Sequence, residues 1–77
     1  MYPSESDRKI RRWGLGLDDQ EAIALLESLL RTCESEDELR REIVFIFGGP
    51  MILVGWEENA KWVSITFQTG RNISASA

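Results

Sequence analysis

Apolar residues recur at helical spacing over residues 18–33, and this pattern predicts one amphipathic helix. Asp18 can cap the first turn, and Glu21 stands three residues later, which is the spacing of a capping box. The apolar positions that follow lie three or four residues apart, as one face of a helix requires. They are Ala22, Ile23, Leu25, Leu26, Leu29, Leu30 and Cys33. We therefore expect this stripe to face the core.

The next segment carries a mixed signal. Ser35 and Glu38 repeat the capping-box spacing, and apolar residues then follow at helical spacing up to Gly48, which can end a helix. In contrast, residues 43–47 are all β-branched or aromatic, the composition of a buried strand. Because no turn residue interrupts the segment, we predict a continuous helix over residues 35–47 and keep a strand at 43–47 as the alternative.

Residues 51–67 have the pattern of a β-hairpin. Two β-prone runs flank a polar turn that contains Asn59. A two-residue loop and a four-residue loop both place Val54 opposite Val63. One face of the hairpin then carries Ile52, Val54, Val63, Ile65 and Phe67, and the other carries Met51, Leu53, Trp62, Ser64 and Thr66. We expect the first face to meet the helices, and we expect the Trp62 ring to cover the bare backbone of Gly55.

Together these elements predict a single small α+β domain that includes all 77 residues. Two helices, or three if the segment before Gly14 forms a short one, pack on one face of a C-terminal β-hairpin. If residues 43–47 are a strand, the sheet becomes a three-stranded antiparallel meander. Residues 1–7 are expected to be a loose N-terminal lead, and residues 70–77 a frayed tail of small polar residues.

The composition removes the commonest kinds of active site. The chain has no histidine and a single cysteine, Cys33, so it cannot assemble a histidine-dependent triad or a zinc site of the usual ligand spacing. Its carboxylate pairs stand at helix starts or turns, where acidic residues have a structural reason. We therefore expect no enzyme, no metal ion and no cofactor. Because no secretory signal or membrane-spanning run is visible, we expect a cytoplasmic protein.

The leading hypothesis is a noncatalytic protein-interaction or regulatory module, such as a small accessory protein, an inhibitor or an assembly factor. We expect it to form a homodimer, because a second copy can cover the open face of the hairpin with the same patch. The N-terminal segment with Trp13 is the alternative cover within one chain. Acidic residues at a helix start can also mimic phosphates toward a basic partner. The candidate partner-binding residues are Met51, Leu53, Trp62, Glu36 and Asp37.

The alternative hypothesis is a nucleic-acid-associated regulator that uses a basic cluster near the N-terminus. Arg8, Lys9, Arg11 and Arg12 precede Trp13. Guanidinium groups bind phosphate, and an aromatic ring can stack on an unpaired base. However, these four charges neutralise few phosphates, and the net charge of −4 opposes binding to nucleic acid. A protein partner is therefore preferred.

The basic cluster is predicted to give weak affinity for nucleic acid at most. That affinity should fall steeply with salt, because it rests on a few phosphate contacts. Fluorescence anisotropy with labelled duplexes and single strands at physiological salt measures it. Submicromolar binding that is lost when Arg11 and Arg12 are changed to Glu would contradict the prediction and favour the nucleic-acid hypothesis.

Overall fold

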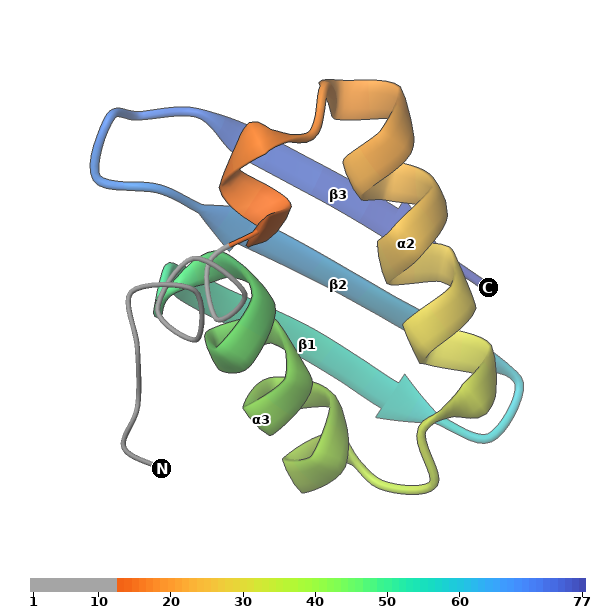
Figure 1. Ribbon diagram of the computed structural model, residues 1–77. Coiled ribbons are helices and arrows are strands. Elements are labelled where there is room, and N and C mark those ends of the chain that lie inside the picture. The colour runs from red at the N-terminus through yellow and green to blue at the C-terminus, as the bar shows by residue number, and fades with distance from the viewer. Residues whose placement is uncertain (1–12) are drawn as a thin grey trace, which may run out of the picture.

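A computed structural model describes residues 13–77, which form two α-helices, one 3-10 turn and three strands (Figure 1). The elements are η1 (Trp13–Gly16), α2 (Asp19–Thr32), α3 (Glu36–Phe47), β1 (Met51–Glu57), β2 (Ala60–Thr66) and β3 (Asn72–Ser76). The strands form an antiparallel meander in the order β1-β2-β3, and both helices pack on one face of it. The α+β fold with helices on one face of a C-terminal sheet is thus confirmed. The expected loose lead at residues 1–7 lies outside the described residues.

The first predicted helix forms as α2, and a capping box holds its first turn. The backbone N–H of Glu21 donates to the Asp18 carboxylate at 2.8 Å, and the backbone N–H of Asp18 donates to the Glu21 carboxylate at 3.3 Å. Ala22, Leu26 and Leu30 are fully buried. The apolar stripe therefore faces the core, as its spacing predicts.

The ambiguous segment forms the continuous helix α3, so the alternative of a strand at its end is excluded. The Ser35 hydroxyl accepts a hydrogen bond from the backbone N–H of Glu38 at 3.2 Å. Only this half of the second capping box is present. The helix ends at Gly48, whose φ of 83° favours glycine and whose N–H donates to the Val44 carbonyl at 2.8 Å.

The hairpin forms in the predicted register. Val54 pairs with Val63 and Ile52 with Ile65, and the two-residue turn at 58–59 connects β1 to β2. Val63 and Ile65 are buried beneath the helices. The face assigned to the core from the alternation of residues is therefore the face that the helices cover.

The expectation of a frayed tail over residues 70–77 is wrong. The segment from Asn72 to Ser76 forms the edge strand β3, which pairs with β2. Ile73 and Ala75 alternate with small polar residues and are buried in the core. The sequence contains this period-two pattern, but a short run of small polar residues becomes a strand only when a neighbouring strand supplies the hydrogen bonds.

Arg71 fastens the turn before β3 to the start of α2. Its guanidinium donates to the Asp19 carboxylate at 2.7 Å and to the backbone carbonyl of Leu17 at 2.9 Å. The same group lies 5.5 Å from the centre of the Phe67 ring. Because Asp19 is largely exposed, this ion pair orients the turn more than it stabilises the fold.

The core is a single layer between the helices and the sheet. In Figure 1, α2 lies over β2 and β3, whereas α3 lies near β1 and η1. The buried apolar side chains are Ala22, Leu26, Leu30, Cys33, Leu39, Ile43, Ile46, Phe47, Val63, Ile65, Ile73 and Ala75. None of these side chains belongs to β1, although β1 is rich in apolar residues.

Gly14→Ala is predicted to destabilise the fold. Gly14 is buried in η1, and a Cβ there would lie 2.5 Å from Ile46 Cγ2 and 2.6 Å from Phe47 Cε1. Overpacking of this kind costs about 1–3 kcal/mol of the free energy of unfolding, which chemical denaturation measures. Gly16→Ala is the matched control, since nothing lies within 4 Å of a Cβ at that position. Equal stabilities of the two variants would contradict the packing described for η1.

Candidate functional site

The face of the sheet that the helices leave open carries an apolar patch. Met51 and Leu53 of β1 and Trp62 of β2 have exposed fractions of 69%, 58% and 44%. Successive side chains of a strand point to opposite faces, so these three share the face away from α2 and α3. The structure thus brings together the three apolar residues that the sequence indicates for partner binding. We call Met51, Leu53 and Trp62 the apolar patch.

The ring of Trp62 can lie close to the sheet because the residue opposite it has no side chain. Trp62 pairs with Gly55 on β1, and a Cβ built on that glycine would collide with the atoms of the indole ring. One side of the ring therefore covers the backbone of Gly55, while much of the remainder is exposed to solvent. A ring fixed in this way loses little conformational entropy when a partner covers it.

Polar side chains fill the rest of the open face. The side-chain amide of Asn72 donates to the Ser64 hydroxyl at 3.0 Å and to the Thr66 hydroxyl at 2.9 Å. The Ser74 hydroxyl donates to the Ser64 hydroxyl at 3.2 Å. This network runs between β2 and β3 beside the apolar patch. The β3 half of this network was not predicted from the sequence, because residues 70–77 were expected to be a frayed tail.

The acidic candidates lie in the helical layer rather than on the open face. Glu36 and Asp37 belong to the first turn of α3, where the Glu36 carboxylate accepts a hydrogen bond from Arg40 at 2.8 Å. The Arg40 guanidinium also donates to the carbonyl of Ile52 at 3.5 Å, which brings the pair to the edge of β1. The structure therefore does not join Glu36 and Asp37 to the apolar patch in one surface.

The candidates for nucleic-acid binding are described in part. Arg8, Lys9, Arg11 and Arg12 lie outside the described residues. Trp13 is in η1 with an exposed fraction of 43%, and η1 lies beside α3 on the helical side of the sheet. Trp13 therefore does not cover the open face of the sheet. The alternative in which Trp13 covers that face within one chain does not hold for this residue.

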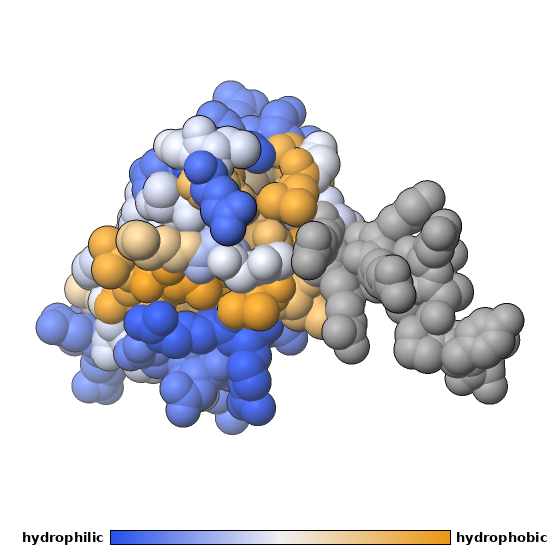
Figure 2. All heavy atoms as spheres, turned by 90° about the vertical axis from the view of Figure 1, so that its left-hand side faces the viewer, coloured by the Kyte–Doolittle hydropathy of each residue, from blue (hydrophilic) through white to orange (hydrophobic). Residues whose placement is uncertain are grey.

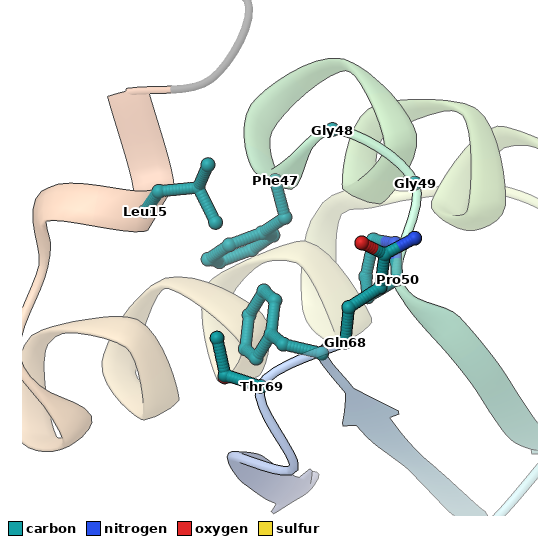
Figure 3. A pocket seen from close by; sticks show the side chains of 8 residues that line it. Leu15, Phe47, Gly48, Gly49, Pro50, Gln68 and Thr69 are labelled. Carbon is teal, nitrogen blue, oxygen red and sulfur yellow. The ribbon is translucent and has the colours of Figure 1, made fainter.

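A shallow cleft of about 360 Å³ lies at the end of the molecule where α3 stops. Leu15 and Phe47 point toward one another at its rim (Figure 3), and Phe47 meets Phe67 edge to face at 5.8 Å. Figure 2 views this end and shows hydrophobic side chains in a band between hydrophilic surfaces. The lining residues are Leu15, Phe47, Gly48, Gly49, Pro50, Phe67, Gln68 and Thr69. None of these side chains ionises near neutral pH, so the cleft offers no carboxylate, thiol or basic side chain.

The described residues offer little further chemistry. Within residues 13–77, no group of histidine, cysteine, aspartate and glutamate side chains could hold a metal ion. Cys33 is buried at the end of α2, and burial raises the pKa of its thiol, with the negative charges of Glu38 and Glu42 adding to the shift.

None of the helices in this part of the chain has the length and apolar character of a membrane span. No known protein family matches the sequence, and no curated protein or solved structure matches the chain.

The raised pKa of Cys33 predicts a thiol that reacts slowly with alkylating reagents. Only an accessible thiolate reacts, and Cys33 is buried with a raised pKa, so alkylation by iodoacetamide at pH 8 should be slower in the folded protein than in urea. Glu38→Gln should speed the reaction of the folded protein, whereas Glu34→Gln, which removes a charge that does not contribute to the shift, should not. Because the pKa of this thiol is higher in the folded than in the unfolded protein, the neutral thiol stabilises the fold fully below the unfolded pKa, at about pH 8.5. This contribution to the free energy of unfolding is lost as the pH rises through the folded pKa. Equal alkylation rates in the folded and unfolded protein would contradict this account.

Proposed function

We propose that the protein is a noncatalytic interaction module that binds a protein partner, most simply a second copy of itself, through the open face of its sheet. The observation that carries this proposal is the apolar patch. Met51, Leu53 and Trp62 are large, adjacent and exposed on a sheet face that neither α2 nor α3 covers. Contiguous apolar surface of this kind, bordered by polar residues, is typical of protein interaction sites.

The arrangement of the open face supports this function. An interaction surface commonly has an apolar centre with an aromatic anchor and a polar rim. Trp62 supplies a ring whose position is fixed by Gly55, and the hydroxyl and amide groups of Ser64 and Asn72 supply a rim. The buried, protonated thiol of Cys33 agrees with a module that works in the cytoplasm. The net charge of −4 opposes contact with nucleic acid. Such a module suits a small accessory protein, an inhibitor or an assembly factor.

Trp62→Lys is predicted to weaken self-association. Loss of a buried aromatic anchor costs about 2 kcal/mol, which is about a 30-fold increase in the dimer Kd. Analytical ultracentrifugation over a dilution series measures this constant, and circular dichroism reports whether the variant folds. Phe45→Lys is the matched control, because Phe45 has the same exposed fraction, 44%, but lies on α3. If the wild-type protein is monomeric at every concentration, self-association is wrong and a heterologous protein partner must be sought for the face.

A further inference from the structure

The side chains of the open face differ in size between the two edges of the sheet. Met51 and Leu53 of the apolar patch belong to β1. The ring of Trp62 covers Gly55, so it also lies above β1 rather than above its own strand. On the same face, the other edge strand, β3, carries smaller polar residues, which we call the shelf: Asn72, Ser74 and Ser76. The open face is therefore high and apolar at β1, and low and polar at β3.

The strand pairing arranges these residues in rows across the sheet. In one row, Leu53 of β1 pairs with Ser64 of β2, which pairs with Ser74 of β3. In the next row of this face, the Trp62 ring occupies the space above Gly55, and the residue on β3 is Ser76. Both rows thus have a large side chain above β1 and a serine on β3.

The open face is almost free of charge, although the protein is acidic. Glu57, at the end of β1, is the one ionisable residue among the strand positions of this face. The net charge of the chain is −4, and the other carboxylates of residues 13–77 lie in the helices, their flanking residues and the turn at 58–59. Two copies repel each other where acidic surfaces meet. The open face is the surface on which they can meet without this repulsion.

Two polar side chains of the shelf already have hydrogen-bond partners within the same sheet. The Asn72 amide donates to the hydroxyls of Ser64 and Thr66, and to the Ile65 carbonyl at 3.1 Å. The Ser74 hydroxyl donates to the Ser64 hydroxyl. Covering a polar group is costly mainly when its hydrogen bonds are lost. Apolar side chains can therefore cover the shelf without leaving these donors unpaired.

We propose that the open face packs on the open face of a second copy, with a twofold axis along β2, so that the apolar patch of each copy rests on the shelf of the other. This inference rests on the proposed function and specifies how the two copies meet. The axis places β1 of one copy over β3 of the partner subunit and keeps each row opposite itself. Leu53 then faces Ser74 of the partner subunit, and the Trp62 ring faces Ser76 of the partner subunit.

Side-chain size favours this axis and a second copy as the occupant. Facing layers reach the density of a protein interior when large residues meet small ones. An axis along β2 gives this match in both rows, and the symmetry repeats each contact. Ser64 lies at the axis and is small enough to face its own copy, and the two Glu57 carboxylates stay at opposite edges. An axis across the strands would instead set one apolar patch against the other and leave space between the two shelves.

Ser74→Tyr tests the contact between the apolar patch and the shelf. The tyrosine ring fills the space that Leu53 of the partner subunit needs, so the dimer Kd measured by analytical ultracentrifugation should rise by roughly tenfold or more. Tyrosine favours strands, and circular dichroism reports whether the variant folds. Ser28→Tyr is the matched control, because Ser28 is exposed on α2 and its substitution should leave the Kd unchanged. A folded Ser74→Tyr protein with the Kd of the wild type would overturn the arrangement.

Cross-linking tests the same contact with smaller substitutions. Facing sheets lie about 10 Å apart, a distance that a short bismaleimide can span between two cysteines. A mixture of the Leu53→Cys and Ser74→Cys proteins should give a covalent dimer with one chain of each kind, which mass spectrometry identifies. Neither protein should give a covalent dimer by itself. The wild-type protein, in which Cys33 is buried, is the blank.

The outcomes distinguish this arrangement from the proposed function. If the Leu53→Cys protein forms a covalent dimer by itself and the mixed species is absent, the two apolar patches face each other. The axis along β2 is then wrong, whereas self-association through the open face stands. If the wild-type protein is monomeric at every concentration, self-association is wrong, and the axis is wrong with it.

Discussion

The structure depends on one apolar layer between two helices and one face of a sheet. The stripes of α2 and α3 are used in full to cover this face, where Leu26, Leu30, Ile43 and Ile65 are completely buried. A chain of this length has no further helix among its described residues with which to cover the opposite face. The second face of a three-stranded sheet must then be polar, remain exposed or meet another molecule. In this protein its β3 side is polar and its β1 side is apolar.

The position of the helices explains why the apolar surface gathers at β1. α2 lies over β2 and β3, and Arg71 ties the turn before β3 to Asp19 at the start of that helix. α3 has fewer contacts with the sheet and leaves β1 half-covered even on the helical face. The strand richest in apolar residues is therefore the one that the fold buries least. The exposure of the apolar patch follows from this unequal coverage.

The candidate surface acts through shape and burial rather than through a reactive group. Gly55 holds the ring of Trp62 against the sheet, and the hydrogen bonds among Asn72, Ser64 and Ser74 fix the polar side of the same face. Preorganisation of this kind lowers the entropy that association costs. Glu36 and Asp37, which lie in the helical layer, are not part of the apolar patch. Glu36 reaches the edge of β1 only through Arg40, so a partner that touches both regions must cross that edge.

The amino-acid sequence by itself determined the features that depend on near neighbours in the chain. These are α2 with its Asp18 cap, the start of α3 at the Ser35 cap, the hairpin register with Val54 opposite Val63, and the faces of that hairpin, whereas a strand at residues 43–47 stayed open as an alternative to the end of α3. Helix caps and short hairpins form within a few residues, so their signals are local. Only the tertiary structure decided that residues 72–76 are a strand, that η1 packs Gly14 against Phe47, and that β1 stays uncovered. Each of these depends on segments distant in the chain, because a strand of small polar residues needs a partner and burial needs a second surface.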